Sequence, residues 1–274
     1  MNKLNPGQEL FKHVFVWTVL TLSFIPLYLM VVVSLKNNTQ FLNNPWMPEA
    51  PFHWENYARA WKYIGPSISN TIYVGVTTII LGIAAALSGA FFFSRYRIAG
   101  SKFLLGVFML LMMYPGVANM VPVFKLVSSL GLYNSHWSVI LIGVAGMQAM
   151  AIYVFKNFID DIPKGLFDAA NVDGCSALGQ LRHIVIPMSM PVISTMAILD
   201  IIGIWNNFVS PMIFLRDSHK QLISVALLHL EGEYTKNWGE LMAGYTIASI
   251  PLIILFIFCM RLFVKGLGEG AVKG

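Results

Sequence analysis

The sequence predicts an all-α, polytopic membrane protein with six transmembrane helices. Hydrophobic residues make up 57% of the 274-residue chain and charged residues only 11%, with a mean hydropathy of +0.67. This composition leaves too few charges to cover a soluble globule of that size. The apolar residues also gather in six stretches long enough to cross a hydrocarbon core, which takes about 20 helical residues.

The six stretches are expected to be helices, because only helices and closed barrels satisfy their backbone in lipid. Their hydrophobic residues do not alternate with the period of two that a barrel strand requires. No internal repeat or low-complexity tract is visible, so residues 1–274 are predicted to form one domain. The spans are expected at about 13–35, 68–94, 103–125, 137–155, 188–214 and 241–263.

The first stretch is interpreted as a retained span. It runs from His13 to Leu35, which is longer than the roughly 7 to 15 residues of a signal-peptide core, and it lacks a small-x-small cleavage site. Six spans place both termini on one side. Cytoplasmic termini put 11 of the 18 Lys and Arg inside, three of them in the short turn SRYRIAGSK. Cytoplasmic termini are therefore predicted.

The segment 36–67 follows the first span on the outer side. It is rich in Pro, Asn and Trp, which predicts a loop lying at the membrane surface. Trp46, Trp54 and Trp61 suit interfacial anchors, because indole rings favour the headgroup level. Docking of a partner protein is the alternative.

The third span carries Tyr114-Pro115 and Val121-Pro122, with Asn119 between them. Proline frees backbone carbonyls and kinks a membrane helix, which is tolerated where neighbours or water satisfy those groups. A kink at a moving seam and a static bend are both consistent with this pattern.

A polar loop of about residues 156–187 separates spans four and five. Acidic residues before Pro163 predict a helix that starts there and runs to about Val172. Gly174 supplies the left-handed position that ends it. Ser176 can cap a second helix, and Pro187 marks the bend into span five. We expect two short helices at an angle, outside the bilayer.

Each short helix has an apolar side. Leu166 and Ala170 share the apolar face of the first helix, and Leu178 lies on the apolar face of the second helix. An amphipathic hairpin on the lipid surface is one interpretation. The alanines favour the other, docking to a protein, because small residues permit close backbone approach.

Span five contains polar residues of its own. A charge at mid-membrane costs about 2.5 to 3.5 kcal/mol, so Asp200 should face protein or water, as an interhelical contact or as part of a gate. Trp205, Asn206 and Asn207 offer an aromatic plane and two amides. These groups suit a sugar, although hydrogen bonding between helices would use the same amides.

At this point the motifs carry a family resemblance. Asp168-Ala169-Ala170, Asp173-Gly174 and Ile186-Pro187 resemble the EAA loop of bacterial ATP-binding cassette (ABC) importer permeases, with Asp168 in place of the family's Glu. PVFKLVSSLGLYNS, WNNFVSPMIFL, WGELMAGY and the tail FVKGLGEGAVKG extend the likeness over most of the chain. Together they resemble the MalG-type carbohydrate permeases of binding-protein-dependent importers.

The resemblance implies a type I ABC importer permease fold and a subunit that forms half of a translocation pathway. In that family the loop is a coupling helix on the ATPase, and ATP drives alternating access. The implied coupling residues are Asp168, Ala169, Ala170, Asp173, Gly174, Leu178 and Pro187. The implied tail contacts to the ATPase are Gly266, Gly268, Gly270, Lys273 and Gly274. The implied pathway residues are Asp200, Trp205, Asn206, Asn207, Tyr114 and Asn119.

Composition alone predicts that the glycine-rich tail is flexible and not helical. The resemblance implies three kinds of partner: a second, MalF-like permease, two ATP-binding subunits and an extracytoplasmic solute-binding protein. The binding protein is expected to dock on Arg216–Glu240. The assembly is expected at the bacterial inner membrane. Lipids surround the spans. Nucleic acid is excluded, because the net charge of +5 is scattered over short loops.

The chain is expected to have no catalytic residues. It lacks a GxxxxGK[ST] motif, so ATP and Mg²⁺ are expected on the partner ATPases. Cys175 and Cys259 fit no ligand spacing, and no metal or cofactor is expected on this chain. A membrane-embedded enzyme and a channel subunit without an ATPase partner remain the alternatives.

Overall fold

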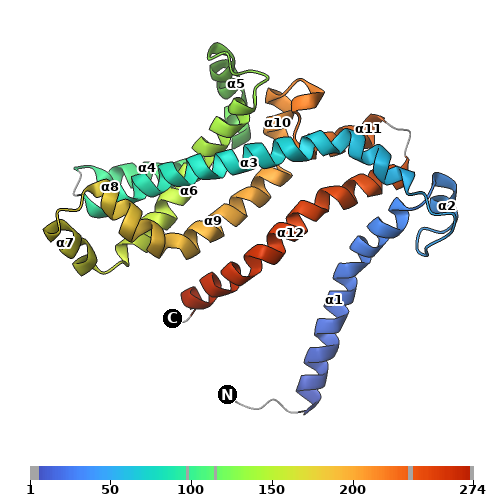
Figure 1. Ribbon diagram of the computed structural model, residues 1–274, viewed down its shortest axis with the longest axis horizontal. Coiled ribbons are helices and arrows are strands. Elements are labelled where there is room, and N and C mark those ends of the chain that lie inside the picture. The colour runs from blue at the N-terminus through green and yellow to red at the C-terminus, as the bar shows by residue number, and fades with distance from the viewer. Residues whose placement is uncertain (1–5, 97–98, 114–115, 234–236, 272–274) are drawn as a thin grey trace. The chain divides into compact units, whose positions relative to one another are not determined.

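The computed structural model describes residues 6–96, 99–113, 116–233 and 237–271 (Figure 1). These residues form helices and loops without a strand, which confirms the predicted all-α class. The elements are α1 (Pro6–Ser34), α2 (Asn38–Asn43), α3 (Glu55–Arg95), α4 (Ser101–Met112), η1 (Gly116–Asn119), α5 (Met120–Ser129), α6 (His136–Asp160), α7 (Lys164–Val172), α8 (Ala177–Gln180), η2 (Leu181–Val185), α9 (Ile186–Asn206), α10 (Val209–Phe214), η3 (Ser218–Lys220), α11 (Ile223–Glu233) and α12 (Trp238–Ala271).

Within the described residues, five helices are long and apolar enough to cross a membrane: Gly7–Ser34, Glu55–Arg95, His136–Asp160, Ala177–Asn206 and Trp238–Phe258. They correspond to five of the six predicted spans. The third span, 103–125, differs because it is divided into α4, η1 and α5. Pro122 lies in the first turn of α5, where a missing N–H costs no helical hydrogen bond.

The fifth predicted span, 188–214, is also divided. Its continuous helix ends at Asn206, and α10 begins at Val209. The break is stabilised by hydrogen bonds, since Ser224 Oγ donates to the Asn207 carbonyl at 2.7 Å and Asn207 Oδ1 accepts from the Ser210 amide at 3.3 Å. Irregular backbone at membrane depth needs such partners.

The loop predicted over 36–67 is wrong in its second half, because α3 begins at Glu55. Ala60 and Ile64 lie four residues apart and are both fully buried, so this part of α3 is amphipathic. Trp46, Trp54 and Trp61 are more than half exposed.

The prediction of a non-helical tail is wrong as far as Ala271, because α12 includes Gly266, Gly268 and Gly270. Each glycine costs about 1 kcal/mol relative to alanine. Extending an existing long helix avoids the unfavourable nucleation step, which is the larger obstacle. Lys273 and Gly274 lie outside the described residues.

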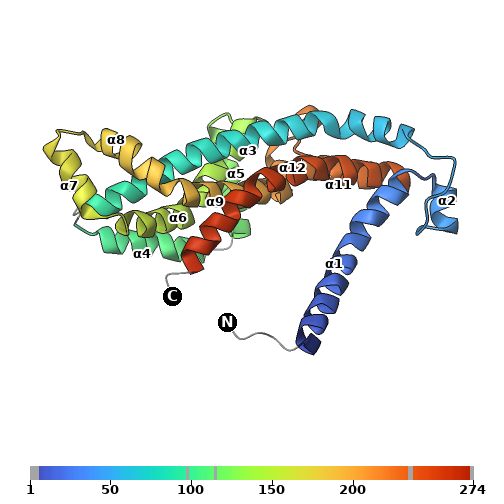
Figure 2. The ribbon, with the colours of Figure 1, turned by 60° about the horizontal axis from the view of Figure 1, so that its bottom comes forward.

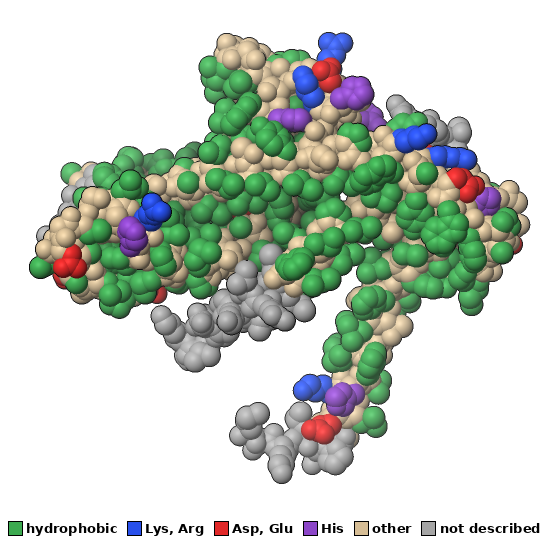
Figure 3. All heavy atoms as spheres, viewed as in Figure 1, with side chains coloured by type: hydrophobic (Ala, Val, Ile, Leu, Met, Phe, Trp, Pro, Cys, Tyr) green, Lys and Arg blue, Asp and Glu red, His purple; other side chains and the backbone are tan. Residues whose placement is uncertain are grey.

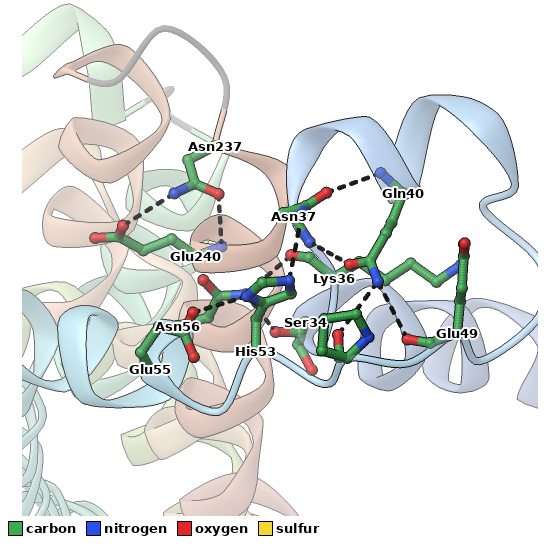
Figure 4. Close-up of polar contacts among 11 residues, drawn as sticks. Ser34, Lys36, Asn37, Gln40, Glu49, His53, Glu55, Asn56, Asn237 and Glu240 are labelled. Carbon is green, nitrogen blue, oxygen red and sulfur yellow. Dashed lines mark hydrogen bonds and ion pairs between the residues drawn. The ribbon is translucent and has the colours of Figure 1, made fainter.

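The chain forms two compact units, residues 1–66 with 226–251 and residues 67–225 with 252–274. In the first unit, polar residues gather where the segment after α1 lies near the starts of α3 and α12 (Figure 4). The Trp238 amide at the start of α12 donates to Asn38 Oδ1 at 3.0 Å. The Asn56 side-chain amide donates to the carbonyls of Ser34 and Lys36, at 2.9 and 3.0 Å. The buried Lys36 ammonium donates to the Asn44 carbonyl.

The second unit contains two apolar clusters. One joins α3, α6, α7, η2 and α9 around Phe155 and Val185, and the other joins α3, α5, α6 and α10 around Ile140 and Phe214. Helix α6 packs against both α4 and α9 (Figure 2). Hydrophobic side chains also cover much of the visible surface, as expected for helices that face lipid (Figure 3).

Gly239 provides a test of the packing in the first unit. A Cβ at this position would overlap the Lys36 carbonyl oxygen and the Asn56 side-chain amide. We expect Gly239→Ala to lower the thermal unfolding midpoint in detergent, by an amount equivalent to about 1–3 kcal/mol. The matched control is Gly232→Ala in α11, where a Cβ meets nothing within 4 Å and raises helix propensity. Equal midpoints for the two variants would contradict the packing.

Candidate functional site: the polar loop between α6 and α9

The first helix of the polar loop agrees with its prediction to within one residue. Pro163 precedes α7, which runs from Lys164 to Val172. Phe167 is the buried residue of this helix, only 5% exposed, and its ring centroid lies 6.4 Å from that of Phe91 on α3. The remaining side chains of α7 are exposed or half-buried. In Figure 1, α7 lies beyond the ends of α3 and α6.

The end of α7 is fixed by backbone hydrogen bonds. Gly174 has a φ of +73°, as predicted, and its N–H donates to the Asn171 carbonyl at 3.1 Å. The Cys175 N–H donates to the Ala170 carbonyl at 2.8 Å. These two bonds form a Schellman motif, which satisfies carbonyls that the helix end leaves without partners.

The second helix starts as predicted and continues into α9. Ser176 Oγ accepts from the Gly179 amide at 3.2 Å, which caps α8. Pro187 does not interrupt the helix, because α8, η2 and α9 follow one another without a break over 30 residues. The intervening η2 is a π-helical turn, and Pro187 lies at the start of α9. The wider turn accommodates a residue without an N–H.

A side chain fastens the two helices to each other. Gln180, which is buried, donates from Nε2 to Asn171 Oδ1 at 2.6 Å. The turn around Gly174 is therefore held from both sides, by the Schellman bonds and by this amide pair. The loop is a defined structure, and the direction of α7 is fixed relative to α8.

Most of the predicted coupling residues are exposed to solvent. Asp168, Ala169, Asp173, Gly174, Leu178 and Pro187 are exposed, and Ala170 is half-buried. Val172 belongs with them although the sequence did not single it out, since it lies four residues after Asp168 and is 89% exposed. The set Asp168, Ala169, Val172, Asp173 and Leu178 is called the α7 surface below. Its apolar side chains and its two carboxylates are exposed.

The predicted pathway residues are not brought together. Asn207 lines a cavity of about 240 Å³ with Thr78 and Ser210, among apolar side chains of α3, α6, α9 and α10. Trp205 is buried and is not among the residues that line it. Asn206 donates to the Ile202 carbonyl of its own helix, at 2.8 Å.

The other pathway residues are dispersed. Asp200 has a buried carboxylate oxygen without a hydrogen-bond partner. Asn119 is exposed where η1 meets α5, and Tyr114 lies outside the described residues. Of this group, Asn207 alone lines the cavity within the described part of the chain.

The segment predicted to meet a binding protein begins in an ordered loop. The Asn134 side chain donates to the Asp217 carboxylate at 2.7 Å and accepts from the amides of Arg216 and Asp217. The first of these bonds holds the pKa of the Asp217 carboxyl below its usual value. Lys220 donates to the Asn134 carbonyl at 2.9 Å, so this part of the loop has a fixed conformation.

Comparison with known proteins identifies the family. Residues 78–269 match the family of binding-protein-dependent transport system inner membrane components. This match covers most of the chain and includes the whole polar loop. The chain belongs to this family.

Two curated bacterial relatives cover nearly the whole chain. The probable ABC transporter permease protein YurM of Bacillus subtilis is 32% identical over 94% of this chain and 88% of that protein. The melibiose/raffinose/stachyose import permease protein MelC of the same organism is 30% identical, over 92% of each chain.

A more distant relative and a solved structure agree with them. The trehalose/maltose transport system permease protein MalG of Thermococcus litoralis is 28% identical over 91% of each chain. The fold matches a chain in the crystal structure of a bacterial ABC transporter involved in the import of the acidic polysaccharide alginate. The TM-score is 0.82 with 19% identity, over 96% of this chain and 100% of that chain.

The resemblance to importer permeases inferred from the motifs is thereby confirmed. The protein is a permease subunit of a binding-protein-dependent importer and a multi-pass inner-membrane protein with the ABC importer permease fold.

Gly174 tests how the α7 surface is held. A Cβ there meets no atom within 4 Å, so Gly174→Ala changes only the backbone cost of a positive φ, about 1–2 kcal/mol. We expect faster amide hydrogen exchange over residues 164–180, because the Schellman bonds open more often. Gly165→Ala, also free of steric contact, should slow exchange by favouring the helix. Similar exchange in the two variants would argue against the motif.

Proposed function

We propose that this permease subunit forms half of a carbohydrate passage and couples it to partner ATPases through the α7 surface. The observation that carries the proposal is an exposed surface of small, apolar and acidic residues on a helix whose position is fixed. A docking element that transmits force has to be rigid and available to its partner. The α7 helix has both properties.

The chemistry of the α7 surface supports contact with a protein. Ala169 and Ala170 permit a close approach of backbones, and Val172 and Leu178 supply apolar area that a partner would cover. Asp168 and Asp173 are exposed acceptors for donors on that partner. The Asp168 side chain is shorter than the Glu of the family motif, so a hydrogen-bond donor on the partner protein has to lie closer to the α7 backbone.

The proposed assembly follows from the family. A second, MalF-like permease completes the passage, and two ATP-binding subunits that carry ATP and Mg²⁺ meet α7 on the cytoplasmic side, where both termini also lie. The end of α12, with Gly266, Gly268 and Gly270, is proposed as a second contact to the ATPases. A solute-binding protein delivers the substrate to the opposite face, at the segment 216–240.

An oligosaccharide is proposed as the substrate. MelC is named for melibiose, raffinose and stachyose import, and other relatives are named for arabinooligosaccharide and galactooligosaccharide transport. The amide of Asn207 and the hydroxyls of Thr78 and Ser210, in the cavity of the second unit, offer partners to sugar hydroxyls. Asp200 remains a proposed pathway residue.

Site-specific crosslinking tests the docking and the orientation. A photo-crosslinking amino acid at exposed Ala169 should capture an ATP-binding subunit in the intact importer. The same amino acid at exposed His219 serves as the matched control, and it should capture no ATPase, because it lies on the proposed outer face. ATPase capture from His219 and not from Ala169 would reverse the orientation. No capture from Ala169 would refute the docking.

The substrate class is tested by stimulated ATP hydrolysis in the reconstituted importer with its binding protein. We expect melibiose, raffinose, maltose, or arabino- or galactooligosaccharides to raise the hydrolysis rate. Amino acids and dipeptides are the controls. Stimulation by the controls alone would contradict a carbohydrate substrate while leaving the coupling role intact.

A further inference from the structure

Arg95, the last residue of α3, is a contact point for three helices. Its guanidinium carbon lies 3.7 Å from the centroid of the Phe167 ring on α7, in cation–π geometry. Its Nη2 donates to the carbonyl of Ile159 at the end of α6, at 2.6 Å, and to that of Ile162 at 3.2 Å. One side chain therefore joins the end of α3 to the end of α6 and to α7.

The carbonyls that Arg95 uses are favourable partners for a cation. The last carbonyls of a helix lack intrahelical donors, and the C-terminal end of the helix dipole is negative. A guanidinium can stack on an aromatic ring while its edge donates hydrogen bonds, which an ammonium cannot do. The arginine is thus suited to hold an aromatic ring against a helix end.

The carboxylates of Asp160 and Asp168 attract the Arg95 guanidinium, but its hydrogen bonds go to the backbone carbonyls of Ile159 and Ile162. Asp160, at the end of α6, accepts from Ser94 Oγ at 2.5 Å and pairs with the Lys156 ammonium at 2.6 Å. The acidic group at this helix end is therefore occupied by other donors. The guanidinium faces the Phe167 ring and the two backbone carbonyls.

The Arg95 contact affects the position of α7 because it is made to Phe167. It is the buried side chain of α7, so the helix is attached to the rest of the second unit through it, through the Asn171–Gln180 bond and through the chain on each side. Without a hold on that ring, α7 and the turn fastened to it would shift relative to the ends of α3 and α6. A helix that shifts in this way would absorb a displacement and would not pass it on.

We propose that Arg95 is a positioning residue that makes α7 move as one body with the ends of α3 and α6. The proposal rests on the proposed coupling role of α7 and identifies how the displacement of that helix reaches the membrane spans. Arg95 acts through Phe167 and contacts no transported substrate.

The first test measures the motion of α7 in the full-length importer. A spin label is attached to Leu166→Cys, a position on α7 outside the α7 surface that is 44% exposed, with Cys175→Ser and Cys259→Ser removing the native thiols. Arg95→Lys should increase the detached population of α7 by up to about 30-fold and increase label mobility, because lysine lacks the flat guanidinium that stacks on the ring while its edge donates to the carbonyls. Phe167→Leu should act in the same direction. The control Lys164→Met removes an exposed positive charge from α7 itself and should change nothing.

The second test measures coupling in the same variants. With the sugar that best stimulates hydrolysis, Arg95→Lys should raise the ATP hydrolysed per transported sugar, while copurification of the ATP-binding subunits stays normal. If Arg95→Lys does not fold, the label mobility and the ATP hydrolysed per transported sugar are measured for Phe167→Leu, and these two results decide the proposal.

Each outcome has a meaning. Higher label mobility together with a higher ATP cost per sugar supports the proposal. Higher mobility with unchanged coupling overturns the transmission role, and unchanged mobility overturns the positioning role whatever the coupling does. Failure of the underlying coupling function would appear separately, as absence of ATPase capture from Ala169.

Discussion

The structure depends on one constraint: a backbone inside a hydrocarbon layer has to satisfy its hydrogen bonds within the chain. Among the described residues, five long apolar helices satisfy this constraint with their own intrahelical backbone hydrogen bonds. The interruptions meet it by other means. At the end of α9, the Ser224 hydroxyl and the Asn207 side chain take over the backbone partners. Before α9, a π turn admits Pro187 without opening the helix.

The same constraint explains why the polar loop is distinctive. The short helices of this loop are defined by caps and side chains. Gly174 and Ser176 set the turn, Gln180 fastens it, and Phe167 attaches α7 to the apolar cluster of the second unit. An exposed surface carried on such a fixed element has the two properties, rigidity and access, on which the proposed ATPase contact rests.

Much of the fold was accessible from local patterns. Hydrophobic stretches located the spans, and Pro163, Gly174 and Ser176 placed the boundaries in the loop, because each acts on its own backbone. The predictions failed where a local signal had two physical outcomes. The tail glycines, for example, could end a helix or merely weaken one that had already formed.

The class of protein, the membrane spans and the motifs of the family could be inferred from the amino-acid sequence, since they follow from composition and from short-range backbone chemistry. Tertiary structure decided which side chains meet. The stacking of Arg95 on Phe167, the exposure of Val172 and the dispersal of the expected pathway residues all depend on how distant helices pack. That packing is cooperative over residues far apart in the chain, so no local pattern encodes it.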